Sequence, residues 1–387
     1  MAALDVDRAR TGSSALVAQL HGFSTTVAQQ RSGFDTAGRL PEELFRELSA
    51  IGLFRLWLPS VMGGHELSAL EFMDVVEAAA ALDGTIGWLA GNGGGMGRVG
   101  AFLPVESALA IFADPDAFVV AATGGTGRAA RVSGGYRVTG RWPFGSGAPH
   151  ATWFSPVCIV DDDGRDSDEV IFVCVPAADV VLHDNWQVSG LCATGSVDFE
   201  LSDVFVPDHF AHPFQPEPKH AGTLYRLPTR SIFVWTVATV PLGIARGAID
   251  EFVRMAGSTK RRGDAVPMAE RELVQSQLGQ IEARVSASRS YLRQSMTELL
   301  DAVEADSNLV GPRANLRLAC TYASQSALWA IGLLTEMAGA IAISRSCPLE
   351  RYERDARAAA KHIAMSPVAY INGGKRLLGH DLSTIPF

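Results

Sequence analysis

The spacing of apolar residues changes twice along this chain of 387 residues. From Ser13 to about Pro115, apolar side chains recur at the period of an amphipathic helix, as at Leu40, Leu44 and Leu48. Near position 119 the period drops to two, and after position 216 the helical period returns. The pattern predicts a mainly helical α+β protein in three parts: an N-terminal helical domain (1–118), a middle β domain (119–215) and a C-terminal helical domain (216–387).

Short runs of β-type residues, broken by glycine, aspartate and proline, fill the middle part. The run from Arg131 to Trp142 predicts a hairpin that turns at Gly134 and Gly135. Several such runs in about a hundred residues predict a compact antiparallel barrel or sandwich. In the last part, four long amphipathic stretches with short connections predict an antiparallel four-helix bundle, over residues 231–257, 268–304, 310–344 and 348–378.

Composition and charge exclude several classes of protein. The chain is 47% hydrophobic, which is enough apolar surface to fold and argues against disorder. Its formal net charge is -9, from 33 Lys and Arg against 42 Asp and Glu, with no long basic run. Such a chain is a poor binder of nucleic acid or of an anionic membrane.

The cysteines and the N-terminal residues predict the compartment. Five cysteines stand far apart without a CxxC pair, which argues against a disulfide framework and a structural metal site. The first twelve residues carry charges and no apolar core, unlike a signal peptide. The apolar run from Ile232 to Ala245 is interrupted by Pro241 and is too short to span a bilayer. We therefore expect a soluble cytoplasmic protein.

Two loops carry the residues that are best suited to hold a ligand. The sequence has no nucleotide-binding GxGxxG or GxxxxGK[ST] motif, no HExxH and no GxSxG. The glycine-dense run 91–97 follows a helical stretch, which favours a turn or a close helix contact over a phosphate loop. The loop WPFGSG (142–147) and the stretch WQVSGLCATGS (186–196) place small hydroxyl residues beside aromatics. Their backbone N–H groups and the Ser146 hydroxyl could face the polar edge of a planar ring.

These loops and the late RYERDARAAAKH segment resemble the acyl-CoA dehydrogenase superfamily over residues 30 to 380. Within it, GGYRVTGRWPFGSG and TGSVDF look most like the flavin-dependent monooxygenases of two-component systems. The resemblance implies an N-terminal helical domain, a middle β domain, a C-terminal four-helix bundle and a homotetramer.

The positions of the dehydrogenase base argue for the monooxygenase branch. Dehydrogenases of the superfamily need a carboxylate that removes a proton next to a thioester. Its commoner position falls on Ile363, eight residues after Asp355, and its rarer position falls near Phe233. Neither residue can act as a base. His362 stands one residue before Ile363, where oxygenase relatives carry a histidine, and it is either catalytic or a hydrogen-bonded structural residue.

The resemblance also implies a set of site residues. The reaction would use reduced FMN or FAD from a separate NAD(P)H:flavin reductase, O₂ and a C4a-hydroperoxyflavin. His362 and Ser146 are the catalytic candidates, although Ser146 could be only a turn hydroxyl. The candidates for cofactor binding, of which the aromatic residues could equally be core, are Trp142, Phe144, Ser146, Gly147, Thr194, Ser196 and Arg261.

The choice of flavin and of substrate stays open at this point. Arg261 would hold a flavin phosphate or merely complement a helix end. The adenosine-binding segment has lost a glycine at residues 336–340, which leaves FMN as plausible as FAD. Met365 replaces a second histidine of sulfur-oxidising relatives, so aromatic, phenolic or amine substrates are favoured. The alternatives are a dehydrogenase with FAD and an unrecognised base, and a non-catalytic relative that binds a ligand.

Overall fold

A computed structural model describes residues 11–162, 165–258, 260 and 266–385. Helices come first, then a sheet, then helices again, as the sequence predicts. The N-terminal helices are α1 (Ser13–Gly22), α2 (Ser24–Ala37), α3 (Glu42–Ala50), α4 (Ala69–Leu82), α5 (Gly84–Met96) and α6 (Val105–Phe112). Two short 3₁₀ turns, η1 (Ser60–Met62) and η2 (Gly97–Ala101), complete this part.

The middle part is one open, mixed sheet. Its strands are β1 (Val119–Val132), β2 (Gly135–Gly145), β3 (Trp153–Asp162), β4 (Arg165–Val173), β5 (Val175–Pro176), β6 (Val181–His183), β7 (Val197–Pro207) and β8 (Ala211–Pro213). They follow the order β6-β7-β2-β1-β3-β4-β8, and β5 pairs with β3.

This order corrects the predicted antiparallel barrel or sandwich. The strand β3 pairs with β1 in parallel, whereas the other neighbours are antiparallel, and the described strands do not close into a barrel. After β2 the chain crosses through η3 (Ala148–His150) and returns on the other side of β1. Alternation of apolar and polar residues marks a strand but not its neighbour, so the sequence pattern could not predict this crossing. The predicted hairpin is confirmed: Val132 pairs with Gly135, and Gly134 has φ +78° in the turn.

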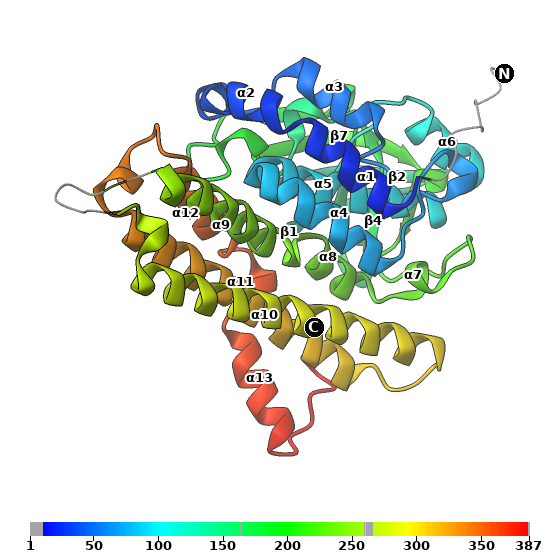
Figure 1. Cartoon of the computed structure of the whole chain (residues 1–387). Coiled ribbons are helices and arrows are strands. Elements are labelled where there is room, and N and C mark those ends of the chain that lie inside the picture. The colour runs from blue at the N-terminus through cyan, green and yellow to red at the C-terminus, as the bar shows by residue number, and fades with distance from the viewer. Residues whose placement is uncertain (1–10, 163–164, 259, 261–265, 386–387) are drawn as a thin grey trace.

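The C-terminal part contains α7 (Thr223–Arg226), α8 (Thr229–Ala238), α9 (Val240–Ser258), α10 (Glu272–Glu304), α11 (Val310–Ala338), α12 (Pro348–Ala359) and α13 (Val368–Leu377). Figure 1 shows α10 as the longest rod of the molecule and α13 projecting away from it. The helices α4 and α5 connect the layers, because α4 packs on α9 while α5 contacts β1 and α8.

Prolines break two of the predicted long helices. The stretch 231–257 divides into α8 and α9 at Thr239, because Pro241 lacks an N–H and clashes with a carbonyl four residues earlier. The stretch 348–378 divides into α12, the 3₁₀ turn η9 (Ile363–Met365) and α13. Ser366 precedes Pro367 and has the extended ψ of 132° that such a residue prefers. His362 therefore lies in a helix break rather than on the long helix that we predicted.

The glycine-dense run 91–97 lies mainly within α5 and allows close contacts. A Cβ atom at Gly91 would lie 2.1 Å from the Thr236 carbonyl oxygen of α8, and one at Gly97 would lie 2.5 Å from the Leu58 nitrogen. Real side chains do not approach so closely. The interpretation as a close helix contact is confirmed.

Two helical stretches are long and apolar enough to cross a bilayer by length and composition, 229–258 and 310–343. In the first, which contains the run that we judged too short, the most apolar window is 89% buried inside the protein. Its apolar residues therefore form core. The corresponding window of the second is only 39% buried, so the α11 region leaves apolar surface uncovered in a single chain.

Candidate active site

A chain of hydrogen-bonded hydroxyl groups joins the two loops that the sequence singled out. The Trp88 indole nitrogen of α5 lies 3.0 Å from Ser146 Oγ. Ser146 Oγ lies 2.8 Å from Ser196 Oγ, which lies 2.6 Å from Thr194 Oγ1. Thr194 Oγ1 donates to the Leu191 carbonyl oxygen at 2.8 Å. The predicted residues Ser146, Thr194 and Ser196 thus form one continuous group.

The ends of this chain fix the direction of every hydrogen bond. An indole N–H can only donate and a carbonyl oxygen can only accept, while each hydroxyl has one hydrogen. Thr194 uses its hydrogen on Leu191, so Ser196 must donate to Thr194, and Ser146 must donate to Ser196. Ser146 also accepts from Trp88. Its oxygen therefore has one lone pair left, and a further ligand atom must donate to it.

The backbone of both loops brings the hydroxyl groups together. Gly147 N donates to the Thr194 carbonyl oxygen at 2.7 Å, which ties the end of the first loop to the second. Gly147 has φ +86°, and a Cβ atom there would lie 2.3 Å from the Phe118 ring. Gly147 thus supports the site through its backbone and its close packing.

His362 lies beside the hydroxyl chain. Its ring packs edge-on against Trp88, with ring centroids 5.6 Å apart and an interplanar angle of 75°. Its Nδ1 accepts from Ala364 N at 3.2 Å, which leaves Nε2 as the protonated nitrogen of the neutral ring. Burial and, to a lesser extent, the Arg317 charge lower the pKa of His362 to about 4. At neutral pH the imidazole is therefore uncharged.

The aromatic candidates have different surroundings. Trp142 is 0% exposed, stacks on Phe199 and donates to the Val157 carbonyl oxygen, so its side chain lies in the core of the sheet. Phe144 is 66% exposed. Its backbone has φ +61°, which is uncommon for a residue with a side chain. Its ring meets the half-buried Trp186 edge-on at 6.2 Å. Phe144 and Trp186 therefore form an apolar edge in the same two loops as the hydroxyl groups.

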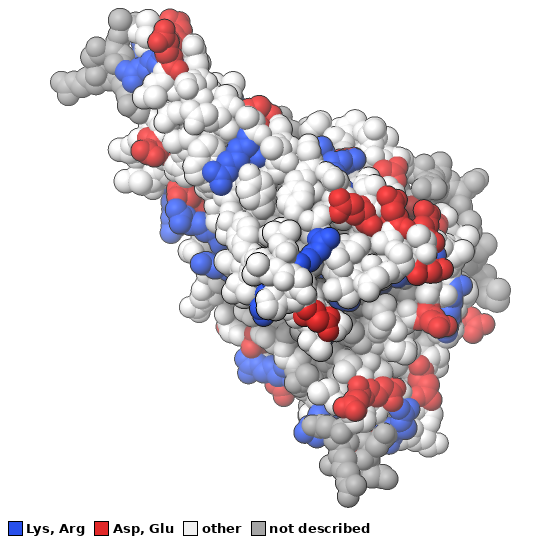
Figure 2. All heavy atoms as spheres, turned by 90° about the horizontal axis from the view of Figure 1, so that it is seen from below, with Lys and Arg blue, Asp and Glu red and all other residues white. Residues whose placement is uncertain are grey.

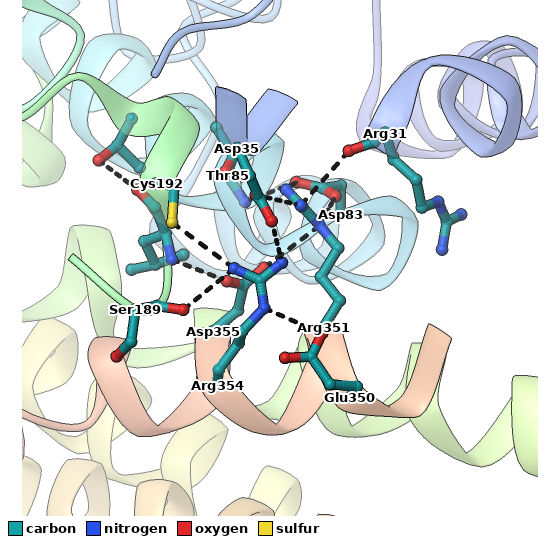
Figure 3. Close-up of polar contacts among 12 residues, drawn as sticks. Arg31, Asp35, Asp83, Thr85, Ser189, Cys192, Glu350, Arg351, Arg354 and Asp355 are labelled. Atoms are coloured by element: carbon teal, nitrogen blue, oxygen red, sulfur yellow. Dashed lines mark hydrogen bonds and ion pairs between the residues drawn. The ribbon is translucent and has the colours of Figure 1, made fainter. Parts of the chain in front are cut away.

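A buried ion-pair network anchors the second loop to α12, as Figure 3 shows. Leu191 N donates to Asp355 Oδ1 at 2.7 Å, and Arg354 donates to the Ser189 carbonyl oxygen at 3.0 Å. Arg351 Nε donates to Asp83 Oδ2 at 2.7 Å, which links α12 to the start of α5. The network thus joins the N-terminal helices, the loop 186–196, which we call the hydroxyl loop, and the C-terminal helices.

The carboxylates of this network crowd one another. Burial raises the pKa of Asp355 to about 7, because the favourable Arg351 charge is offset by Asp83 nearby. Asp355 Oδ2 lies 3.6 Å from Arg351 Nε, which is too long for a hydrogen bond. The short hydrogen bond of Asp355 is the one that it accepts from Leu191 N in the loop, which makes Asp355 a structural residue.

The residues present fit a flavin in a reduced state. Reduced flavin carries a hydrogen on N5 and oxidised flavin does not, and the remaining lone pair of Ser146 can accept from such a donor. The exposed Phe144 ring offers an apolar face for a planar ring system. Arg261, the predicted phosphate ligand, lies outside the described residues.

The dehydrogenase positions contain no acid in the structure either. Ile363 is 74% exposed, and Phe233 packs against the apolar cluster around Val99 and Phe112. The charged group that perturbs His362 is the cation Arg317, and Arg317 donates to the Ile363 carbonyl oxygen at 2.7 Å. These contacts supply no carboxylate base for an α-proton.

Other features lie away from this site. A hollow of about 470 Å³ lies between α1, α4, α9 and α10 and is lined by ion-paired residues such as Asp74, Glu77 and Arg289. Within the described part of the chain, no group of three or more His, Cys, Asp or Glu residues could hold a metal ion.

Sequence reasoning missed Trp88 as the donor that starts the hydroxyl chain. Trp88 belongs to an apolar helical run and is 8% exposed, so its pattern is that of an ordinary core residue. A single tryptophan before a glycine-dense run was the available signal, and it does not indicate which residue the indole meets.

Comparisons with known proteins match both helical parts of the chain. Residues 14–102 match the N-terminal domain of acyl-CoA dehydrogenases, and residues 235–367 match their C-terminal domain. Indole-3-acetate monooxygenase of Pseudomonas putida is 28% identical over 348 residues, covering 89% of each chain. The oxygenase component of an FADH₂-dependent resorcinol hydroxylase from a Rhizobium species is 27% identical, covering 91% of this chain and 90% of that protein.

Solved structures give the same result. The structure of XiaF from a Streptomyces species in complex with FADH₂ and glycerol superposes with a TM-score of 0.88 at 25% identity, covering 97% of each chain. The two domain models lie at the two ends of the fold, and a relative from Rhodococcus jostii that is named as the oxygenase subunit of a flavin-dependent monooxygenase is 27% identical, covering 92% of this chain and 96% of that protein. The chain therefore belongs to the acyl-CoA dehydrogenase superfamily, in which it is most similar to the flavin-dependent monooxygenases.

Proposed function

We propose that this protein is the oxygenase component of a two-component, flavin-dependent monooxygenase. The observation that carries the proposal is the fixed direction of the hydroxyl chain, which leaves Ser146 Oγ as an acceptor at a half-exposed position. Such an acceptor matches the N5–H of reduced flavin. Two relatives over most of the chain are named as oxygenase components or subunits of this class, one of them FADH₂-dependent.

Reduced FMN or FAD, when bound, would activate O₂ by the C4a-hydroperoxide route that the resemblance implies. The reaction balances: one oxygen atom enters the substrate, the other leaves as water, and the flavin supplies two electrons. A separate NAD(P)H:flavin reductase must regenerate the reduced flavin. Named relatives act on indole-3-acetate and resorcinol, so we propose a small aromatic, phenolic or amine substrate.

The chain's own residues orient, exclude water and move a proton. Ser146 accepts from the flavin edge, and Ser196 and Thr194 hold the Ser146 hydrogen away from it. The edge of Phe144 and Trp186 excludes water from the reacting ring, which protects against loss of peroxide. His362 is neutral, and its Nε2–H can donate to a developing negative charge or exchange a proton with the substrate.

The proposal extends to assembly and location. The α11 region is incompletely covered, and Ile343, Leu377 and Leu378 are more than three-quarters exposed. Figure 2 looks at the molecule from the side on which α13 projects, and shows wide uncharged areas between separate charged groups. A homotetramer would cover such areas, and we propose that it works in the cytoplasm.

The test is to mix the full-length protein anaerobically with photoreduced FMN or FAD, and then with oxygenated buffer. We expect binding of reduced flavin and a slowly decaying oxygenated species in the absorbance spectrum. Bleaching of tightly bound FAD by an acyl-CoA would instead identify a dehydrogenase. No affinity for flavin in either redox state would identify a non-catalytic relative.

A further inference from the structure

Three arginine side chains are buried among the described residues, and one of them lacks hydrogen-bond partners. Arg55 donates to the carbonyl oxygens of Phe112, Asp114 and Pro115. Arg351 pairs with the carboxylates described above. Arg98, which is 4% exposed, has no partner for Nε or Nη2. An unpaired buried cation is costly to a fold, so this position needs an explanation.

Arg98 lines a small cavity together with two further polar side chains that lack partners. These are His212, whose Nε2 is unpaired, and Thr229, whose Oγ1 is unpaired. Met96, Phe172 and Phe233 supply apolar walls. The space left is about 10 Å³, roughly enough for one water-sized group. We call this cavity, with these six residues, the Arg98 pocket.

The charges around the Arg98 pocket are positive and no lining residue is acidic. The Arg98 guanidinium lies over the Phe102 ring at 4.8 Å, and no ion pair joins it to a carboxylate in the described part of the chain. Burial lowers the pKa of Arg98 to about 9, which still leaves it charged at neutral pH. Lys219 adds a second positive charge near His212.

His212 and α8 are compatible with a bound anion. The Nδ1 of His212 donates to the Pro213 carbonyl oxygen at 2.8 Å, and burial lowers its pKa to about 4. The ring is thus neutral, and its free Nε2 can accept from a hydroxyl or a water molecule beside an anion. Thr229 is the first residue of α8, so the positive end of that helix also lies at the pocket.

Two helices connect the Arg98 pocket to the candidate active site. Trp88, Asn92 and Met96 follow one another at intervals of four residues along one face of α5. Trp88 contacts Ser146 and His362, and Met96 lines the pocket. Eight residues of helix span about 12 Å. On the other side, α8 carries Phe233 at the pocket and contacts η9, which follows His362.

We propose that the Arg98 pocket binds a carboxylate group of the substrate, whose aromatic ring then lies toward Trp88 and His362. This inference rests on the proposed function for the identity of the ligand as substrate. Arg98 would hold the two carboxylate oxygens, and the Thr229 hydroxyl would donate to one of them. Met96 and Phe233 must move to admit the group, and the flexible methionine side chain suits that movement.

The test measures equilibrium binding by calorimetry to the flavin-free, full-length protein. The probes are 4-hydroxyphenylacetate and indole-3-acetate, each paired with its neutral amide. We expect at least one acid to bind at least ten-fold more tightly than its amide. In Arg98→Met this preference should disappear, while the affinity for the amide stays within about two-fold of wild type.

Arg55→Met is the matched control, because Arg55 is equally buried and has its own partners. It should lower the melting temperature yet keep the preference for the acid. Arg98→Met should melt no earlier than wild type, since it removes an unpaired buried charge. Thr229→Val is a second variant that keeps Arg98 and should reduce the affinity for the acid several-fold.

Several outcomes would overturn the inference. These are equal binding of acids and amides by the wild type, a preference that survives in Arg98→Met, or sodium acetate binding as tightly as the aromatic acids. These binding measurements use the flavin-free protein and do not depend on the oxygenation reaction. The two proposals can therefore fail separately. If the protein prefers the acid through Arg98 but does not bind reduced flavin, the proposed oxygenase function is wrong and the carboxylate site remains.

Discussion

The hydrogen of the Ser146 hydroxyl is committed to Ser196, and this commitment decides what Ser146 can recognise. A serine alone in a loop turns its hydroxyl to suit either a donor or an acceptor. Here Trp88 at one end and the Leu191 carbonyl at the other remove that freedom. Ser146 Oγ therefore offers an acceptor to a further ligand, and the flavin site that we propose would distinguish reduced from oxidised flavin by one hydrogen bond.

Replacing Ser146 with alanine should uncouple the reaction. Ser146→Ala should change the free energy of binding of reduced flavin by no more than about 1 kcal/mol, the usual net contribution of one hydrogen bond. The oxygenated flavin should then release hydrogen peroxide faster, as measured by rapid-mixing absorbance and a peroxidase assay. Ser167→Ala, which removes a hydroxyl that donates to Val160 on the same sheet, is the control. Wild-type coupling in Ser146→Ala would remove it from the site.

His362→Asn tests proton transfer. We expect flavin binding and the melting temperature near wild type, while product formation falls by at least ten-fold, within the range of general acid–base catalysis. Because burial depresses the pKa of His362 to about 4, its neutral form should persist as pH falls below 6.5. NMR titration of the flavin-free protein should place its midpoint near 4. A variant that melts early but turns over normally would indicate a structural histidine.

At the level of elements, α12 holds the hydroxyl loop from outside. The loop from Trp186 to Ser196 has little regular structure of its own, apart from η5 (Cys192–Thr194). Asp355 and Arg354 on α12 bind its backbone at Leu191 and Ser189. The RYERDAR segment therefore helps to hold the loop that carries Thr194 and Ser196.

Asp355→Ala should loosen that loop. The change leaves the buried Leu191 N–H without an acceptor, at a cost of about 1–3 kcal/mol in the free energy of unfolding. Coupling of flavin oxidation to product should fall as well, because Leu191 ends the hydroxyl chain. Glu353→Ala, on the same helix and paired with Arg357, is the control. Chemical denaturation and the coupling assay measure both effects. Unchanged coupling in a destabilised Asp355→Ala would show that the loop keeps its shape without α12.

Glycines of α5 set the distance to α8. Gly91→Ala would place a Cβ atom 2.1 Å from the Thr236 carbonyl oxygen, and overpacking of this kind costs about 1–3 kcal/mol. Gly279→Ala is the matched control within α10, where no heavy atom lies within 4 Å of the added carbon. That change should stabilise the protein by about 0.5–1 kcal/mol. Thermal unfolding checks the helix contact: the melting temperature should fall in Gly91→Ala and rise in Gly279→Ala.

At the scale of the whole molecule, sequence patterns predicted elements better than their neighbours in space. Periodicity predicted the order of helices and strands, and loop composition together with the resemblance led to Ser146, Thr194, Ser196 and His362. The parallel pairing of β1 with β3 was missed because the alternation of apolar and polar residues does not indicate which strands are neighbours. Trp88 and Arg98 were missed for a related reason: each belongs to an apolar segment, and only the fold shows which partners it meets or lacks.

The uncovered apolar surface leads to the last prediction, which concerns assembly. Leu377 is 89% exposed and Leu378 79%, at the end of α13, the helix that projects from the bundle in Figure 1. Isolated apolar residues on a surface need no explanation, but here Ile371 on the same helix is also exposed. Burial in a subunit contact would remove this area from water.

A charge in that contact should therefore split the proposed homotetramer. Leu377→Asp would bury an unpaired carboxylate at each copy of the contact, which costs far more than the lost apolar area. Sedimentation velocity should show smaller species for Leu377→Asp, with an unchanged circular dichroism spectrum. Val61→Asp is the control, because Val61 is 63% exposed in the N-terminal part, away from α13. If Leu377→Asp sediments as wild type does, α13 lies outside the contact, and if wild type is already monomeric, the proposed tetramer is wrong.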